Sequence, residues 1–301
     1  MASEYISVIK SYKELSITGV FSRRSINLNK IKKKLNVPVF NYKYFRKLYK
    51  YRRPDAVIIC VSEQNTFKVL KNIFKFRTII LCEKPIGINY LESIKILKLL
   101  NKSYADAYVA LNRRYYQSTL KLLKILKNCK KKRIVEATDQ QDQQMMLSTG
   151  KNKKVVNNLM YANSVHIIDY AKIICRGSVK KITNSKISYS KNKYIALSEI
   201  MFSSGDKFLY KGYWNIPQRW SVKIFLNKNI FLLKPLERLV KKKLKKSNIY
   251  KLDKVDKLYK PGLKILIDQL IKRIRNKKNL LISFKKHMQT IDLIKRIYEK
   301  V

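Results

Sequence analysis

The sequence predicts an α/β protein in which a doubly wound parallel sheet is followed by a mostly antiparallel, open-faced sheet with helices on one face. Up to about residue 115, short apolar runs alternate with helical patterns, as in successive βαβ units. Beyond that point, strand-like segments follow one another with turns between them. Hydrophobic residues make up 46% of the 301 residues, enough for a core in each part. We therefore expect two domains, 1–115 and 116–301.

The first part contains five expected helices and five expected strands. Helices are expected over 3–13, 28–35, 42–51, 66–74 and 90–100, and strands over 15–21, 37–40, 55–61, 78–82 and 107–111. The strand at 55–61 is a continuous apolar run, which is typical of a parallel strand buried on both faces. Because such sheets bind ligands at the carboxyl ends of their strands, the residues after each strand are the first candidates for a site.

The second part begins with a helix and then becomes rich in strands. Strands are expected over 132–138, 180–189, 194–202, 207–215, 221–226 and 229–235, and helices over 118–128, 157–169, 261–274 and 284–298. This order fits a largely antiparallel sheet. We also expect that sheet to join copies of the chain into a homo-oligomer.

The chain is strongly basic, with 68 Lys and Arg against 19 Asp and Glu and a net charge of +49. Such a charge ordinarily suggests nucleic acid. Here the lysines are spread over every segment, among many Ile, Asn and Tyr residues, which favours compositional drift over a selected site. The densest run, Lys241–Lys246, is where an anion site is expected if there is one. No zinc-finger spacing or RNP-like box supports a specific nucleic-acid site.

The cysteines indicate neither a metal site nor a disulfide framework. Cys60, Cys82, Cys129 and Cys175 lie far apart without a C-x-x-C pair, and the chain has two His residues. We expect a cytoplasmic protein without a bound metal. No apolar stretch is long enough to span a membrane, and nothing resembles a signal peptide.

A motif follows the strand at 78–82. Glu83-Lys84-Pro85, with Gly87 shortly after it, resembles the signature of the Gfo/Idh/MocA oxidoreductases. The stretches 55–59 and 108–115 resemble that family's strand before its first cofactor loop and the segment after a later strand. The resemblance covers essentially the whole chain.

The resemblance implies a hydride-transferring enzyme and assigns residues to its cofactor. Lys84 would contact both nicotinamide and substrate, beside Glu83. The other implied cofactor contacts in this half are Val61, Ser62, Asn112 and Arg113. The loop after residue 61 departs from the family pattern, since Ser62 and Thr66 stand where the family often has Pro and His.

The resemblance also indicates that the Gly-rich turn of the dinucleotide fold is incomplete here. No G-x-G-x-x-G occurs, and Ala2 occupies the position of the third glycine. We expect the first strand of the fold to be missing, as in a chain truncated at its N-terminus. That strand would lie between those at 15–21 and 55–61, so tight cofactor binding is expected only when it is restored.

Cofactor choice depends on the end of the second strand. An acidic residue there would bind the ribose of NAD, but this chain has Ser22, Arg23 and Arg24. An Arg fork can pair with a 2′-phosphate, so NADP is favoured and NAD remains possible. The alternative is an ordinary basic loop.

The chemistry of the second part centres on the helix expected over 157–169. The family has an Asp four residues before a His, both in the active site; here His166 matches the His, but the Asp position is Ala162. Asn163 and His166 are the substrate-binding candidates, together with Lys84. A helix would place Asp169 on the same face as His166.

Two further stretches are weaker candidates. Asp139–Gln144 is a polar cluster after a strand, either a solvated loop or a binder of substrate hydroxyls. The segment Trp214–Trp220 resembles a family sheet segment near substrate, although two aromatic residues in a sheet more often serve packing.

These observations predict an NADP-dependent oxidoreductase acting on a sugar or sugar derivative, with Lys84 and His166 as the acid–base residues. Two alternatives stay open. One is a family member that binds ligand without turnover, suggested by Ala162 and the incomplete turn. The other is a polyanion-binding protein that uses the basic surface.

Overall fold

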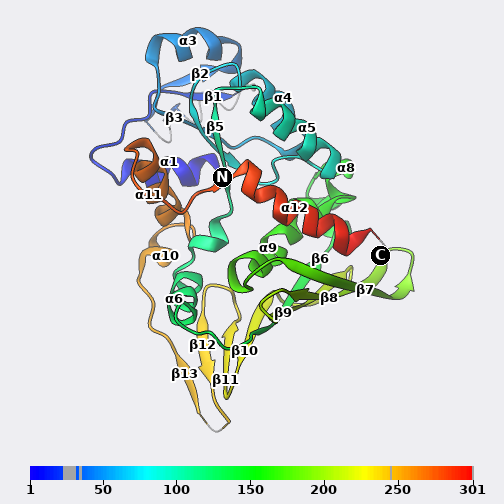
Figure 1. Cartoon of the computed structure of the whole chain (residues 1–301). Helices are drawn as coiled ribbons and strands as arrows, with labels where there is room; N and C mark the ends of the chain where they lie inside the picture. Colours follow the sequence, from blue (N-terminus) through cyan, green and yellow to red (C-terminus); the bar gives the residue numbers. More distant parts are fainter. Residues whose placement is uncertain (23–31, 34–35, 245, 300–301) are drawn as a thin grey trace.

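A parallel sheet with helices on both faces forms the first part of the chain (Figure 1). The structure is a computed structural model that describes residues 1–22, 32–33, 36–244 and 246–299. The strand order is β14-β5-β4-β3, with β3, β4 and β5 parallel and β14 antiparallel to β5. The bounds are β3 (Ala56–Ile59), β4 (Ile79–Glu83), β5 (Asp106–Ala110) and β14 (Ile282–Ser283).

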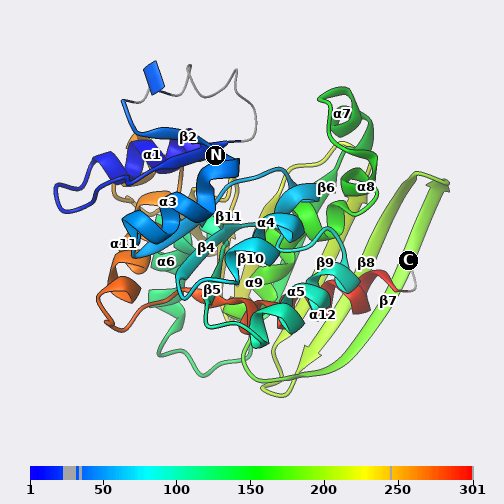
Figure 2. The ribbon, with the colours of Figure 1, turned by 90° about the horizontal axis from the view of Figure 1, so that it is seen from above.

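Two groups of helices cover this sheet. Residues 57 and 59 of β3 pack toward the α3 and α4 side, whereas residues 56 and 58 pack toward α1 and α11. Figure 2 shows α4 and α5 on the first side and α1 and α11 on the other. The bounds are α1 (Ala2–Lys10), α3 (Phe45–Arg52), α4 (Thr66–Ile73), α5 (Tyr90–Asn101) and α11 (Leu263–Ile274).

The sequence explains why β4 ends where it does and a helix follows. Leu81 and Cys82 are fully buried, whereas Glu83 and Lys84 are polar and lie at the rim. The Asn89 side chain then accepts a hydrogen bond from the Glu92 backbone N–H and caps α5. The strand therefore delivers Lys84 at the carboxyl edge of the sheet.

A separate pair of strands, β1 (Val20–Ser22) and β2 (Val39–Asn41), lies beside this sheet without joining it. The predicted strand over 15–21 is wrong in extent, because residues 15–19 are not in a sheet. The physical reason is the lack of a neighbour: strand-forming residues become a strand only when another edge pairs with them. The helix expected over 28–35 lies largely outside the described residues.

The second part is an eight-stranded sheet of order β13-β12-β11-β10-β6-β9-β8-β7. All its pairs are antiparallel except the central β6–β9 pair. The bounds are β6 (Ile134–Gln141), β7 (Val179–Ser190), β8 (Lys193–Phe202), β9 (Lys207–Trp214), β10 (Ser221–Leu226), β11 (Asn229–Leu233), β12 (Leu239–Lys242) and β13 (Ser247–Ile249). The last two were not expected, and the first two residues of the Lys241–Lys246 run lie in β12.

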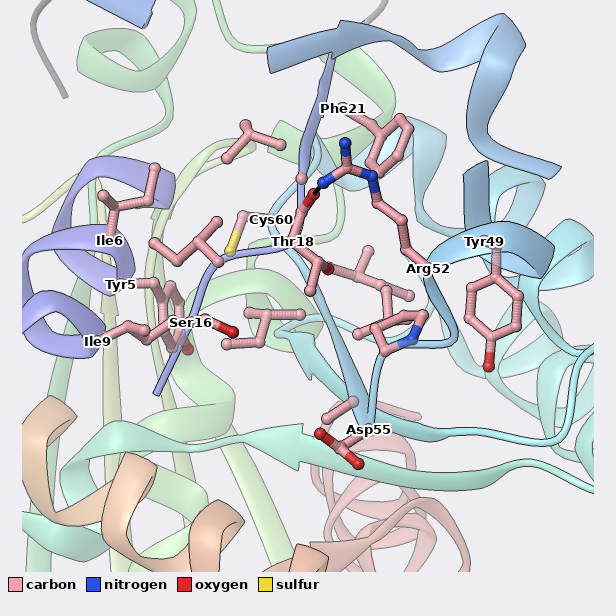
Figure 3. A pocket seen from close by; sticks show the side chains of 18 of the residues that line it. Tyr5, Ile6, Ile9, Ser16, Thr18, Phe21, Tyr49, Arg52, Asp55 and Cys60 are labelled. Carbon is pink, nitrogen blue, oxygen red and sulfur yellow. Dashed lines mark hydrogen bonds between the residues drawn. The ribbon is translucent and has the colours of Figure 1, made fainter. Parts of the chain in front are cut away.

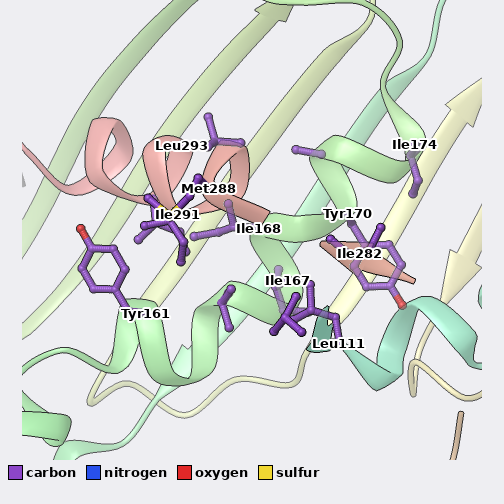
Figure 4. Packing of buried hydrophobic residues seen from close by; sticks show 14 of the residues in the cluster. Leu111, Tyr161, Ile167, Ile168, Tyr170, Ile174, Ile282, Met288, Ile291 and Leu293 are labelled. Atoms are coloured by element: carbon purple, nitrogen blue, oxygen red, sulfur yellow. The ribbon is translucent and has the colours of Figure 1, made fainter. Parts of the chain in front are cut away.

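Helices α9 (Val165–Ile174) and α12 (Phe284–Tyr298) pack against one another between the two sheets (Figures 1 and 4). Ile168 of α9 and Ile291 of α12 are fully buried in their interface region. Helix α12 also contacts α5 and β5 of the first sheet. The Ser283 side chain accepts from the Lys286 N–H and begins this helix after β14.

The remaining helices are short except α6. They are α6 (Gln117–Leu126), α7 (Gln143–Ser148), α8 (Lys153–Val156), α10 (Val255–Leu258), the 3₁₀ turns η1 (Tyr42–Tyr44), η2 (Glu63–Asn65) and η3 (Asn112–Tyr115), and the π-helical turn η4 (Met160–Ser164). Among the described residues, no helix is both long and apolar enough to cross a bilayer.

Candidate active site

The carboxyl ends of three neighbouring strands bring the predicted residues of the first part to one edge. Glu83 at the end of β4 is paired with Ala110 at the end of β5, and Ile59 of β3 is paired with Cys82. Val61 and Ser62 follow β3, Lys84 follows β4, and Asn112 and Arg113 follow β5. Parallel pairing therefore gathers residues from three loops at the edge where such sheets bind ligands.

Lys84 reaches from this edge to the second part of the chain. Its Nζ donates to the backbone carbonyl of Ala162, 2.5 Å away, in the π-helical turn η4. Burial and then the Arg113 guanidinium lower the pKa of Lys84 to about 8, against the carboxylates of Glu83 and Glu63. An amine with this pKa can both give and take a proton near neutral pH.

Arg113 lies near Lys84 and forms no ion pair with a carboxylate in the part of the chain that the structure describes. Its guanidinium stacks over the Trp220 ring at 4.3 Å from the centroid, and its buried Nε has no hydrogen-bond partner among the described residues. Burial lowers the pKa of this guanidinium. An unpaired donor on a buried cation is costly unless a ligand completes it, so Arg113 is suited to an acceptor oxygen.

His166 is also buried, with 5% of its surface exposed, and its Nδ1 has no partner in the described part of the chain. Burial, followed by the charges of Arg113, Lys84 and Lys260, holds the pKa of His166 well below its usual value. The imidazole is therefore neutral at physiological pH and can accept a hydrogen bond. Residue 162 supplies a carbonyl to the site but no carboxylate.

Asn163 is tied to a buried polar network in β6. Its Nδ2 donates to the Gln141 Oε1 at 2.9 Å, and the Gln141 Nε2 donates to the Asp139 Oδ1 at 2.6 Å. The Tyr210 hydroxyl donates to the Asp139 Oδ2 at 2.7 Å, and burial raises the pKa of Asp139. The network fixes Asn163 at the wall of the site.

The expectation that Asp139–Gln144 lies after a strand is therefore wrong for its first residues. Strand β6 continues to Gln141, because parallel pairing with β9 extends to the Gln141–Trp214 register. Asp142 then caps α7 by accepting from the Met145 N–H. Only the later part of this cluster is a helix on the surface.

Asp169 has a structural partner. Arg114 donates to both carboxylate oxygens, at 2.5 and 2.7 Å, and the Thr290 hydroxyl donates to Oδ1 at 2.9 Å. This buried pair joins η3, α9 and α12. It orients the segment that carries Arg113 on one side and the helix that carries His166 on the other.

A salt bridge links the loops of the two parts near Lys84. Glu63 in η2 pairs with Lys151, which lies between α7 and α8. Ser62 precedes this turn and accepts a hydrogen bond from the Asn65 side chain. Val61, 38% exposed, and Ser62 thus lie at an accessible rim.

The N-terminal end of α1 offers the anion-binding end of a dinucleotide fold. Helix α1 begins at Ala2, whose neighbours in the first turn are exposed, so its free N–H groups face solvent. The Tyr5 hydroxyl donates to the Glu83 Oε1 at 2.7 Å and joins this helix to the end of β4. Burial raises the pKa of Glu83.

The residues present fit part of a dinucleotide. The unpaired Arg113 Nε and His166 Nδ1, with Lys84 between the sheets, form a polar lining for the nicotinamide and substrate end. When bound, the nicotinamide would supply the hydride acceptor or donor. Ser22 ends β1, whereas Arg23 and Arg24 lie outside the described residues. No three His, Cys, Asp or Glu gather as metal ligands within the described ranges.

Several neighbours of the site could not be assigned from sequence. Trp220 is 107 residues from Arg113, and Lys151 is 88 residues from Glu63. Lys260 is likewise distant in sequence from His166, whose pKa it lowers. Only the aromatic pair Trp214–Trp220 and the Asp139–Gln144 cluster carried a signal. The structure places Trp220 against Arg113, and Gln141 accepts the hydrogen bond of Asn163, which gives each stretch a local role.

Comparison with known proteins agrees with this fold. Residues 1–110 match the family model described as the GFO_IDH_MocA oxidoreductase family with an NAD-binding Rossmann fold. A dehydrogenase from Chromobacterium violaceum aligns with a TM-score of 0.81 at 14% identity, over 99% of this chain and 91% of that one. No curated protein sequence matches this chain significantly.

Two further structures carry descriptions that name nucleotide sugars. UDP-N-acetylglucosamine 3-dehydrogenase from Acidithiobacillus ferrooxidans aligns with a TM-score of 0.78 at 13% identity, over 99% and 93% of the two chains. The WlbA dehydrogenase from Bordetella pertussis, in complex with NADH and UDP-GlcNAcA, aligns with a TM-score of 0.77 at 12% identity, over 99% and 91% of the two chains. At these identities the likeness shows a shared fold.

The fold and the matched segment define the class: an oxidoreductase-type protein with an NAD-binding Rossmann-like domain followed by a larger, mostly antiparallel sheet domain. More particularly, residues 1–110, which include the Glu83-Lys84-Pro85 motif, match the Gfo/Idh/MocA family model, in agreement with the resemblance seen in that motif.

Proposed function

We propose that this protein transfers hydride between NADP(H) and a hydroxyl-bearing carbon of a sugar or sugar derivative. The observation that carries the proposal is the meeting of Lys84, Arg113 and His166 where the two sheets face each other. The nucleotide-sugar descriptions of two related folds support the substrate class. We assign residues 1–115 to the cofactor domain and 116–301 to the substrate domain.

In this proposal Lys84 orients the reacting hydroxyl and exchanges its proton. Its low pKa and its place after β4 suit both roles. His166, neutral and adjacent, is the second acid–base group, and Asn163 is a substrate contact. Arg113 offers its unpaired Nε to an acceptor oxygen, which suits a sugar derivative that carries an acidic group.

We propose NADP as the preferred cofactor and NAD as a possible one. Ser22, Arg23 and Arg24 follow the strand that would meet the adenosine ribose, and a related fold from Desulfitobacterium hafniense has a description that names an NADPH-dependent oxidoreductase. Ala2, Val61, Ser62, Glu83 and Asn112 complete the proposed cofactor contacts. A reducing cytoplasm and a homo-oligomer formed through the large sheet are part of the same proposal.

The second candidate function is ligand binding without turnover. Ala162 favours it, because the site has a carbonyl where a carboxylate would strengthen proton transfer. The two functions differ in one measurement: nicotinamide reduction or oxidation over a panel of nucleotide sugars and free sugars.

Lys84→Met tests the enzymatic proposal. Met keeps the apolar stem and removes the ammonium, so kcat and kcat/KM should fall together by about 10²–10⁴-fold, with cofactor affinity nearly unchanged. Lys95→Met, an exposed lysine on α5, is the matched control. A comparable loss in His166→Ala would make the two residues the working pair, whereas normal turnover by Lys84→Met would remove the central residue from the mechanism.

Arg23→Ala tests the cofactor preference. Loss of a charge-assisted contact to the 2′-phosphate should weaken NADP binding by roughly 1.5–3 kcal/mol and leave NAD binding almost unchanged. Calorimetric titration with both cofactors gives the two affinities. An equal change for NAD and NADP would show that Arg23 does not contact the 2′ position.

A further inference from the structure

One end of the large sheet carries a row of lysine-rich turns. Ile134, the first residue of β6, pairs with Phe225 near the end of β10 and with Lys207 at the start of β9. Ile230 of β11 pairs with Lys242, the last residue of β12. The turns at the ends of these strands therefore lie side by side. We call them the lysine edge, which comprises residues 130–133, 203–206, 227–228, 242–244 and 246.

The lysines of this edge are exposed. They are Lys130, Lys131, Lys132, Lys228, Lys242, Lys243 and Lys246. None of them forms a salt bridge within the described residues. Asp206 is the one acidic residue in the sequence of the edge, and Arg176 binds its carboxylate. The edge is therefore more one-sided in charge than the whole chain, in which 19 Asp and Glu accompany 68 Lys and Arg.

Two arginines fix the backbone from which several of these lysines extend. The Arg176 guanidinium donates to the Lys130 and Lys131 carbonyls, at 3.0 and 2.8 Å. Arg133 is buried and donates to the Ile174 carbonyl at 2.6 Å. These two guanidinium groups are bound to the protein itself, whereas the lysine ammonium groups remain available to a partner.

The β12–β13 hairpin projects at the end of the molecule away from the first sheet (Figure 1). In its turn, the Lys243 N–H donates to the Lys246 carbonyl at 2.8 Å, and the Lys246 N–H donates to the Lys243 carbonyl at 3.3 Å. Leu244 lies in this turn and is fully exposed. Tight hairpin turns favour Gly, Asn and Asp, and an exposed Leu gains no burial. Neither turn chemistry nor packing within the chain accounts for this residue.

We propose that the lysine edge docks on an anionic lipid bilayer, with its ammonium groups at the lipid headgroups and Leu244 at the boundary between headgroups and acyl chains. Clusters of lysine are attracted to anionic lipids, and an apolar side chain among them adds burial of apolar surface. The lysine ammonium is a compact point charge, which suits headgroups that are not held in a fixed geometry.

The side chains of the edge favour a bilayer over a nucleic acid. Proteins that hold single-stranded nucleic acids add stacking of bases on aromatic or arginine side chains to their phosphate contacts. No aromatic residue occurs in the sequence of these turns. Arg133 is buried, and Arg176 is bound to Asp206 and to backbone carbonyls. The apex carries an aliphatic side chain, which suits acyl chains rather than bases.

Docking at the lysine edge leaves the candidate active site free. Strand β6 begins at this edge with Ile134 and ends at Gln141, whose side chain accepts from Asn163. Its eight residues span about 25 Å, so the bilayer and the site lie at opposite ends of the strand. The inference does not rest on the proposed function, because docking needs neither cofactor nor substrate.

Sedimentation of the full chain with lipid vesicles tests the proposal. One set of vesicles is phosphatidylcholine alone, and the other is equal parts of phosphatidylcholine and phosphatidylglycerol. The mixed vesicles should bind the protein at least about tenfold more tightly, and added salt should weaken this binding. Equal binding to both sets would overturn the proposal, because the surface would then not select anionic lipid.

A matched pair of double variants locates the surface. Lys243→Gln with Lys246→Gln removes two charges from the lysine edge. Lys68→Gln with Lys71→Gln removes two from the exposed side of α4, whose inner side lines the apolar cavity beside β3 (Figure 3). The first pair should weaken binding to mixed vesicles by about tenfold or more, and the second by less than about twofold. Equal losses would overturn the proposal, since total charge rather than the edge would then govern binding.

Leu244→Ser separates a bilayer from other polyanions. Loss of the apolar side chain should weaken binding to mixed vesicles by about threefold or more and leave binding to duplex DNA unchanged. Leu91→Ser, at an exposed Leu on α5, is the control and should change neither. If Leu244→Ser bound vesicles normally while the Lys243 and Lys246 double variant lost vesicles and DNA alike, the edge would be a general polyanion surface and the bilayer proposal would be wrong.

Discussion

Burial of the Lys84 side chain disfavours its charged form. The ammonium is buried between the two sheets and finds one backbone carbonyl, that of Ala162, as its hydrogen-bond acceptor. A carboxylate at residue 162 would offset this burial, but the chain has none there. The site therefore retains a destabilising charge, as functional sites commonly do.

The buried charge of Lys84 leads to a prediction about the free energy of unfolding. The folded-state pKa of Lys84 is about 8 and its ordinary value is 10.5, so the folded state binds the proton less tightly than the unfolded state. Below about pH 8 the penalty is fully present, and it disappears as the pH rises from 8 to 10.5. Lys84→Met should thus raise the free energy of unfolding at pH 7, by on the order of 2–3 kcal/mol after loss of the Ala162 hydrogen bond.

Denaturant unfolding of the cofactor-free protein at several pH values measures this effect. The gain of Lys84→Met over the parent chain should shrink steadily between pH 8 and pH 10.5. Lys95→Met, which replaces an exposed lysine, should show a difference that does not change over that interval. A pH-independent gain in the Lys84 variant would mean that packing, rather than the buried charge, sets the difference.

At the scale of elements, strands and helices with their own local signals could be predicted, and those that depend on a neighbour could not. The pattern gives α12 (Phe284–Tyr298) at its observed bounds and β10 (Ser221–Leu226) likewise. Residues 15–19 have strand-forming side chains but no partner edge, so they stay outside a sheet. Strands β12 (Leu-Val-Lys-Lys) and β13 (Ser-Asn-Ile) lack a clear apolar alternation. They become strands only because β12 pairs with β11 and β13 pairs with β12.

The residues of the candidate site also fall into those that the sequence could predict and those that depend on distant contacts. Glu83-Lys84-Pro85 and His166 were found from a local motif, because their spacing lies within single elements. The stacking of Arg113 on Trp220 and the bridge from Glu63 to Lys151 join distant segments, so no periodicity reports them. The pairing of Asp169 with Arg114 likewise required knowing that η3 and α9 meet.

The outer face of the large sheet leads to a prediction about assembly. The inward residues of β8 and β9 are buried, but Ile195, Leu197, Leu209 and Tyr213 on the other face are only half-buried. These apolar side chains share the face with Glu199, Lys207 and Lys211, and such a mixed, half-buried face is where we expect the contact between copies. Leu209→Lys should convert the proposed homo-oligomer to a smaller species, because it places a charge on that face.

Light scattering coupled to gel filtration reports the mass of each species. The control is Met145→Lys, which adds the same charge at an exposed apolar residue on α7. An unchanged mass for Leu209→Lys, with an oligomeric parent, would assign the interface to another surface. A monomeric parent would contradict the proposed assembly itself.

For the whole molecule, the basic surface leads to a prediction about polyanions. The net charge of +49 is spread along the chain, and the acidic partners of most lysines are absent because the chain has only 19 Asp and Glu. Binding to duplex DNA should therefore be weak, independent of base sequence and steeply reduced by salt, as counterion release requires. Anisotropy titrations with two unrelated duplexes over a range of salt concentrations measure this. Affinity that persists in high salt and differs between duplexes would indicate a selected nucleic-acid site.

The position of β3 at the end of its sheet also bears on how this protein behaves at high concentration. Within the described residues, one edge of β3 has no strand partner, and such an edge is a template for pairing with another molecule. At low ionic strength the large positive charge keeps the molecules apart. Added salt shortens the reach of that repulsion to about 10 Å at 0.1 M. We therefore expect the protein to stay dispersed in dilute buffer and to precipitate more readily as the salt concentration is raised. This is opposite to the salting-in of many proteins.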